Sequence, residues 1–274
     1  MWGFADYAAG ICARRVGAVR TAFAMQSTGL LSFAVVMWAV GRWPAFEPGM
    51  VPYAVALGVT GVIAVAALYR GLALGPVAVV APVVASYVVI TVILVVIFLG
   101  ERLSLAQILA ASLVFVGVVL TSTDARELRV TLGRPVPGVR IGLISTVGFG
   151  LWAAIFAIAT RQYSWIAMVL LLRATSFVLI GAFVASRQID LRVFRERVIL
   201  ALGTTVGILD TLANGLFARG IETGYASLAA TGTGMYPIVP AVLGMLALGE
   251  RLAPNQIVGI VLLVIGLATL GAVS

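Results

Sequence analysis

The 274-residue sequence contains no histidine and no lysine, and Cys12 is its only cysteine. These absences exclude an intrachain disulfide, a metal site built from Cys and His, a His-based triad and a Schiff-base lysine. We therefore expect no cofactor and no metal. Charged residues make up only 10% of the chain and hydrophobic residues 62%. Soluble domains carry about 25% charged residues, so the composition predicts an all-α polytopic membrane protein.

All 18 basic residues are arginine, and the formal net charge is +8. These arginines lie in short segments between apolar runs and do not gather on one basic face. The pattern therefore predicts loop charge that orients a membrane protein, and it excludes a nucleic-acid partner.

Ten apolar runs are separated by charged residues or by Pro and Gly. A helix needs about 20 residues to span a bilayer, and the strict alternation of a membrane β-barrel is absent. The expected spans are 1–13, 17–40, 51–69, 76–99, 104–122, 140–160, 163–186, 198–218, 225–248 and 254–273. The first run is short for a span, which predicts that the authentic first helix begins upstream of Met1.

The chain contains an internal repeat at an offset of 149 residues. The sequence Leu-Gly-Glu-Arg-Leu occurs at 99–103 and again at 248–252, and residues 69–117 share 15 identities with their 49 counterparts. Each half then holds five spans, and an odd number places the second half in the opposite orientation. The sequence predicts two inverted repeats, 1–122 and 140–274, joined by the polar linker 123–139.

Two repeated motifs have a structural interpretation. The Gly-Glu-Arg turns, which comprise Gly100, Glu101, Arg102, Gly249, Glu250 and Arg251, are expected to end one helix and begin the next within a few residues. The Arg-Gly-x-x-x-Gly motif at 70–75 recurs at 219–224 and places small residues where helix backbones approach closely.

These motifs resemble the drug/metabolite transporter superfamily, in its ten-helix, two-repeat EamA-type branch. The features that carry the resemblance are Trp2-Gly3, Gly71-x-x-x-Gly75-Pro76 and Leu99–Leu103 with Gly117, with second-half echoes at Trp152, Ala226-Ser227 and Leu248–Leu252. The resemblance implies a secondary transporter in the cytoplasmic membrane, usually an exporter of small metabolites, amino acids or drug-like compounds. It leaves the substrate open.

Two other functions are alternatives to transport. An intramembrane lipid-modifying enzyme would need acids or histidines clustered at one interface, whereas the ten acidic residues are scattered. A non-transporting membrane scaffold would need no charge at the bilayer centre, where an ionisable side chain costs about 2.5–3.5 kcal/mol on insertion scales.

Four residues inside the spans are the main site candidates: Asp6, Arg173, Asp210 and Asn214. In one interpretation, Arg173 and Asp210 form an ion pair that only holds helices together. In the other, these side chains line a polar cavity, where Arg173 holds an anionic group or neutralises a carboxylate. Asp6 or Asp210 would then carry a coupling proton, since burial favours the neutral form of a carboxyl group.

Weaker cavity candidates are Tyr7, Gln26, Tyr87, Trp152 and Tyr236. Prolines in the matching fourth and ninth spans, Pro76, Pro82, Pro237 and Pro240, interrupt helix hydrogen bonds and predict a pathway beside those spans.

Loop arginines also predict the orientation. With ten spans, thirteen loop arginines lie on one side and four on the other. The positive-inside rule makes the richer side cytoplasmic and places both termini outside. Ten-helix relatives are usually drawn with both termini inside, so the charge rule and the resemblance disagree.

Overall fold

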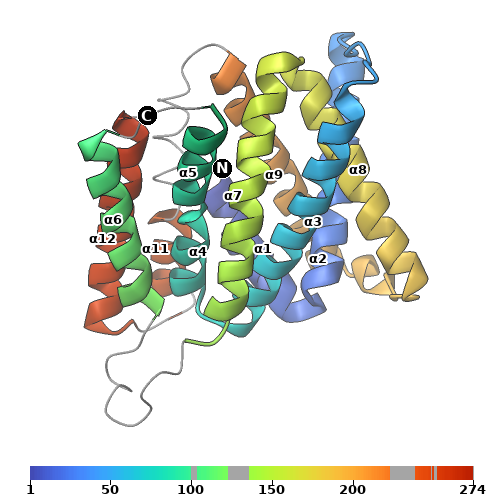
Figure 1. The fold of residues 1–274 in the computed structure, drawn as a ribbon. Helices are drawn as coiled ribbons and strands as arrows, with labels where there is room; N and C mark the ends of the chain where they lie inside the picture. Colours follow the sequence, from blue (N-terminus) through green and yellow to red (C-terminus); the bar gives the residue numbers. More distant parts are fainter. Residues whose placement is uncertain (100–103, 123–135, 223–237, 248, 250–251, 274) are drawn as a thin grey trace.

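The computed structural model describes the chain except residues 100–103, 123–135, 223–237, 248, 250–251 and 274 (Figure 1). The described residues form helices and no strand. The helices are α1 (Trp2–Val16), α2 (Ala18–Val40), α3 (Met50–Leu74), α4 (Val77–Ala85), α5 (Tyr87–Leu99), α6 (Leu105–Ser122), α7 (Val139–Gln162), α8 (Trp165–Ser186), the short 3₁₀ helix η1 (Arg192–Arg195), α9 (Arg197–Glu222), α11 (Ile238–Ala247) and α12 (Pro254–Val273).

The pattern of exposure is that of a protein surrounded by lipid. Six helices, α2, α3, α7, α8, α9 and α12, are long and apolar enough to cross a membrane. Large apolar side chains such as Leu31, Trp38 and Phe115 lie on the outside, whereas Asp6 and Arg173 are buried. This distribution opposes that of a protein folded in water, because lipid accepts apolar side chains and the protein interior must hold the charges.

The expected span 76–99 is interrupted in the structure, but at Ser86. Helix α4 ends and α5 begins there, after Pro76 and Pro82. The Ser86 hydroxyl donates to the Val83 carbonyl at 2.6 Å, and the Val89 amide donates to the Ser86 carbonyl at 3.0 Å, three residues back. A serine hydroxyl that donates to a carbonyl of its own helix competes with the backbone hydrogen bonds of the α-helix. At Ser86 the turn is narrowed to the three-residue spacing of a 3₁₀ helix.

Repeat-related helices α6 and α12 lie side by side at one edge of the molecule (Figure 1). A Cβ at Gly117 would lie 2.8 Å from the backbone nitrogen of Leu263, and a Cβ at Gly266 would lie 2.9 Å from that of Val114. Both pairs of positions, 117 with 266 and 114 with 263, differ by the sequence offset of 149. The two contacts therefore mirror each other and run antiparallel, as the inverted repeat predicts.

Glycines also bring the ends of α3 and α7 together. A Cβ at Gly71 would lie 3.2 Å from the Gly138 carbonyl oxygen, while Tyr53, near the start of α3, donates to Gln162 Oε1 at 2.9 Å. The close approach at Gly71 confirms the packing interpretation of the Gly71-x-x-x-Gly75 motif. The same contacts show that α3 and α7 run antiparallel.

Helices α2 and α9 approach closely through Gly29 and Gly207. A Cβ at Gly207 would lie 2.7 Å from the Met25 carbonyl oxygen, and a Cβ at Gly29 would lie 3.5 Å from the Arg173 guanidinium carbon. Small residues on this seam let two backbones approach. They also leave room for the Arg173 guanidinium between α2 and α9.

Candidate functional site

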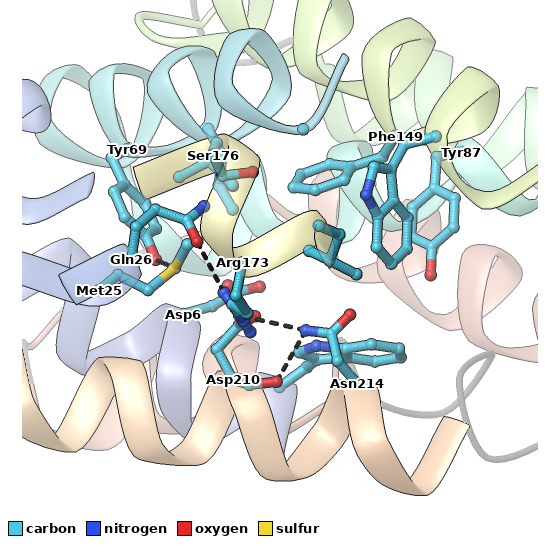
Figure 2. A pocket seen from close by; sticks show the side chains of 16 residues that line it. Asp6, Met25, Gln26, Tyr69, Tyr87, Phe149, Arg173, Ser176, Asp210 and Asn214 are labelled. Carbon is cyan, nitrogen blue, oxygen red and sulfur yellow. Dashed lines mark hydrogen bonds and ion pairs between the residues drawn. The ribbon is translucent and has the colours of Figure 1, made fainter. Parts of the chain in front are cut away.

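A cavity lies among helices of both repeats. Side chains from α1, α2, α3, α5, α7, α8 and α9 surround it (Figure 2). About 60 Å³ of it admits the centre of a water molecule, several times the 10–15 Å³ that a single water needs. The lining residues are Trp2, Asp6, Met25, Gln26, Gly61, Val65, Leu68, Tyr69, Tyr87, Phe149, Trp152, Leu172, Arg173, Ser176, Asp210 and Asn214.

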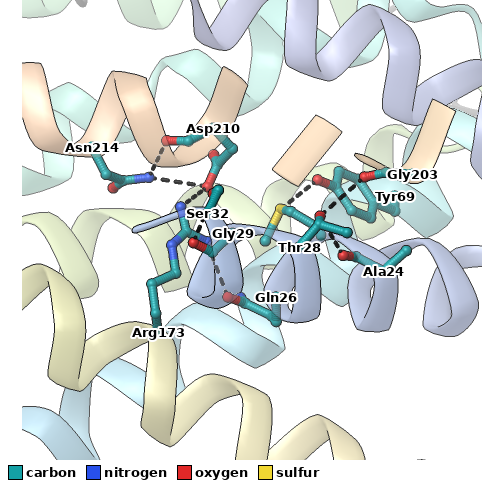
Figure 3. A network of polar contacts seen from close by, with 11 residues as sticks. Ala24, Gln26, Thr28, Gly29, Ser32, Tyr69, Arg173, Gly203, Asp210 and Asn214 are labelled. Atoms are coloured by element: carbon teal, nitrogen blue, oxygen red, sulfur yellow. Dashed lines mark hydrogen bonds and ion pairs between the residues drawn. The ribbon is translucent and has the colours of Figure 1, made fainter. Parts of the chain in front are cut away.

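Arg173 occupies the centre of the polar side of this cavity. It projects from α8, and only 1% of it is exposed. Its Nη1 donates to Gln26 Oε1 of α2 at 3.0 Å, and its Nη2 forms an ion pair with Asp210 Oδ2 of α9 (Figure 3). The guanidinium therefore ties α2 and α9 to α8, and its charge is balanced by one carboxylate.

Asn214 positions that carboxylate. One helical turn beyond Asp210, its Nδ2 donates to the Asp210 backbone carbonyl at 2.7 Å and to Asp210 Oδ2 at 3.0 Å. Asp210 Oδ2 thus accepts from both Arg173 and Asn214, an arrangement in which charge strengthens each hydrogen bond.

Several buried polar atoms around the ion pair have no hydrogen-bond partner in the part of the chain that the structure describes. They are Arg173 Nε, Ser176 Oγ, Asn214 Oδ1 and Thr211 Oγ1. Three of these four residues line the cavity. A buried polar atom without a partner is costly, so such a group needs water or a ligand.

Asp6 brings a second carboxylate to the same space. It comes from α1, is 8% exposed, and lies close enough to Asp210 for the two charges to interact. With Arg173 positive and Asp210 negative, the charge of these three side chains is zero when Asp6 carries a proton and −1 when it does not. Whether the cavity is charged therefore depends on Asp6.

The other side of the cavity is aromatic. Tyr87, Phe149 and Trp152 line it, and the Trp152 ring stacks on Phe156 with centroids 4.9 Å apart. Phe156 in turn stacks on Phe217, which meets Trp2 edge-on at 5.6 Å. The cavity thus combines a charged end with a wall of flat apolar rings.

The structure brings together most of the residues predicted for the site. Asp6, Gln26, Tyr87, Trp152, Arg173, Asp210 and Asn214 all line one cavity. The Arg173–Asp210 pair exists and also faces the cavity, so the two interpretations of this pair describe the same geometry. A transport role for these residues stays a prediction.

The remaining candidates lie elsewhere. Tyr7 is not among the lining residues. Tyr236, with the turn residues Gly100, Glu101, Arg102, Glu250 and Arg251, lies outside the described residues. Gly249 is described and has φ +66°, a left-handed conformation that suits a helix-ending glycine. Of the prolines, Pro76 precedes α4 and Pro82 lies within it, but the cavity residue from this span is Tyr87.

Sequence reasoning missed Ser176, Tyr69 and Phe149. Ser176 lies three residues after Arg173 in the same helix, so the two share a helix face. That spacing could have revealed it. Tyr69 and Phe149 gave no such signal, because one aromatic residue in an apolar span resembles any lipid-facing or packed ring.

Comparisons with known proteins agree with this architecture. Twelve chains of solved structures match this chain. One, named only "Crystal structure of protein", has a TM-score of 0.64 and 19% identity, and the match covers 97% of this chain and 94% of that chain. At this identity the likeness establishes the fold alone. No curated protein matches the chain.

The model of the EamA-like transporter family matches residues 1–123 and again residues 136–272. One family model thus accounts for each half in turn, which is the duplication that the offset of 149 indicates. Since the two matches cover nearly all of the sequence, this chain belongs to the EamA-like transporter family.

Proposed function

We propose that this protein is a secondary active transporter that moves a small compound across the cytoplasmic membrane by alternating access through the cavity. Its ten spans, with α4 and α5 as two parts of one broken span, would form inverted five-helix repeats divided as 1–122 and 140–274. The observation that carries the proposal is the Arg173–Asp210 ion pair beside unpartnered buried polar atoms, in a cavity lined by both repeats.

The position of the site supports this mechanism. Asp6 and Gln26 come from the first repeat, and Arg173, Asp210 and Asn214 come from the second. When inverted repeats move against one another, a site at their interface is exposed to one side of the membrane and then to the other. A cavity at such an interface is therefore suited to transport.

Asp6 is our candidate for proton coupling. The Asp210 carboxylate already has Arg173 as counter-ion, whereas Asp6 accepts no hydrogen bond from another described residue. Release of a proton from Asp6 would change the charge of the cavity and leave the ion pair in place. Export of the substrate against proton entry requires such a group.

Alternating access can be tested without knowing the substrate. In a Cys12→Ala background, Asn214→Cys places a single thiol in the cavity. In oriented proteoliposomes, we expect it to react with a membrane-impermeant maleimide added from either side. The control is Leu212→Cys, which lies on the same helix but is half exposed on the outer surface and should stay unlabelled in lipid. Labelling of Asn214→Cys from one side only, or from neither, would contradict alternating access.

Proton coupling needs a transported compound, which a thermal-shift screen of amines, amino acids and organic acids would supply. Asp6→Asn keeps the shape of the side chain but removes its exchangeable proton. We expect this variant to exchange the compound across proteoliposomes and to lose accumulation driven by a pH gradient. Unchanged accumulation would assign the coupling to another group.

A further inference from the structure

Three groups of the cavity, Asn214 Oδ1, Ser176 Oγ and the Asp6 carboxylate, can accept a hydrogen bond from a ligand. Asn214 Oδ1 is buried and unpaired, and the Asp6 carboxylate accepts no hydrogen bond from another described residue. Ser176 Oγ can donate or accept, and Arg173 Nε–H is the one unpaired donor among these atoms. A ligand with several donors therefore suits the three acceptors of this set.

Asn214 cannot resolve this by turning its amide group. Its Nδ2 already donates to two acceptors, the Asp210 carbonyl and Asp210 Oδ2. Rotation of the amide by 180° would place oxygen against oxygen at both contacts. Asn214 Oδ1 therefore keeps its orientation as an acceptor in the cavity wall (Figure 2).

Arg173 is poorly placed to hold an anionic ligand. Its two outer nitrogens each have an acceptor, Gln26 Oε1 and Asp210 Oδ2 (Figure 3). Three of its five N–H groups remain, among them Nε–H. The Arg173 charge is already balanced by Asp210, so an anion would bring an uncompensated negative charge into the cavity, where such a charge is costly.

The aromatic wall also favours a positively charged ligand. Tyr87, Phe149 and Trp152 line the other side of the cavity. The face of an aromatic ring attracts a cation within about 6 Å of the ring centre. The same rings accept a flat apolar group, so one wall suits both parts of an amphipathic amine.

We infer that, within the transport function proposed above, the cavity recognises the protonated primary amine of a compound whose remainder is apolar and flat. The ammonium donates to Asn214 Oδ1, Ser176 Oγ and the Asp6 carboxylate, and the apolar part packs on the aromatic wall. Arg173 acts as the permanent counter-ion of Asp210 and does not receive an anion.

Four compounds of similar size test the head group: phenethylamine, 2-phenylethanol, 3-phenylpropionate and phenethyltrimethylammonium. Binding is measured by calorimetry on the full chain in nanodiscs. Hydrogen bonds to charged groups predict that phenethylamine binds about tenfold or more tightly than each of the others. The trimethylated compound keeps the charge and lacks N–H donors, so equal affinity for it would overturn the inference. Tighter binding of the acid, or no binding of phenethylamine, would overturn it as well.

Single substitutions test which residues bind the ammonium group. Asn214→Val removes the unpaired acceptor, and Asp6→Asn removes the charge, so each should weaken phenethylamine about tenfold. Leu212→Ala on the outer surface of α9 should leave the affinity unchanged. Unchanged affinity of the Asn214→Val variant would exclude the proposed contact.

The two proposals fail separately. If the amine binds but the Asn214→Cys thiol reacts from one side only, the cavity is a ligand site without alternating access. If the Asn214→Cys thiol reacts from both sides but the acid binds more tightly than the amine, the protein is a transporter with the opposite head-group specificity.

Discussion

Helices α3 and α9 occupy repeat-related places but contribute opposite chemistry to the cavity. At the offset of 149, Asp210 of α9 corresponds to Gly61 of α3, and Asn214 corresponds to Val65. All four residues line the cavity. The duplication therefore supplied two equivalent walls, and only the second carries a charge and an amide.

The correspondence is also visible in the packing of the two helices. Gly58 and Gly207 differ by the same offset, and each holds its helix against a threonine. A Cβ at Gly58 would lie 2.9 Å from Thr175 Cβ of α8, and a Cβ at Gly207 would collide with Thr28 Oγ1 of α2. Helix packing has kept the repeat symmetry, while the cavity surface has lost it.

The largest effect on stability is expected where that symmetry is broken. Arg173→Leu leaves the Asp210 carboxylate without its counter-ion, and loss of one partner of a buried pair costs about 3–5 kcal/mol. The double variant Arg173→Leu, Asp210→Asn should recover much of this stability, because no unpaired charge remains. Thermal unfolding in detergent measures both.

Transport distinguishes the two interpretations of the pair. We expect the single variants and the double variant all to be inactive in counterflow, although the double variant is the more stable. A double variant that recovers both stability and transport would make the pair purely structural.

A smaller and symmetric effect is expected at Gly117 and Gly266. Alanine at either position would press a Cβ against the backbone of the partner helix, and overpacking costs about 1–3 kcal/mol. Because the contacts mirror each other, both substitutions should lower the unfolding temperature by similar amounts. The control is Gly181→Ala, whose Cβ would meet only Phe23 Cε2 at 3.9 Å. A large loss in one glycine variant and none in the other would show that this symmetry is only apparent.

The smallest effect on stability is expected near the start of α3. Tyr53 donates to Gln162 Oε1 in an exposed hydrogen bond, whereas the repeat-related residue of α9 is Leu202, which has no hydroxyl. Tyr53→Phe keeps the ring contact with Tyr163 and removes only the hydroxyl. We expect a loss of about 1 kcal/mol or less in thermal unfolding. A loss several times larger would mean that this end of the α3–α7 pair contributes more than its contacts indicate.

Composition and residue pattern are sufficient to predict the membrane class, the duplication and most of the cavity residues. The spans could be located because lipid demands long apolar helices, and the repeat because Gly and charged residues match in register within an otherwise uniform composition. Asp6, Arg173, Asp210 and Asn214 were conspicuous for the same reason, since a charge or amide inside a span needs a partner.

Which of these residues contact one another depends on how the helices pack. The contact of Arg173 with Gln26 joins residues 147 positions apart, and no pattern within either helix encodes it. The break at Ser86 and the cavity positions of Tyr69, Phe149 and Ser176 were not predicted from the sequence either. In an apolar span, residues that face lipid, a neighbouring helix or a cavity have similar compositions, and only the packing of the helices distinguishes the three surroundings.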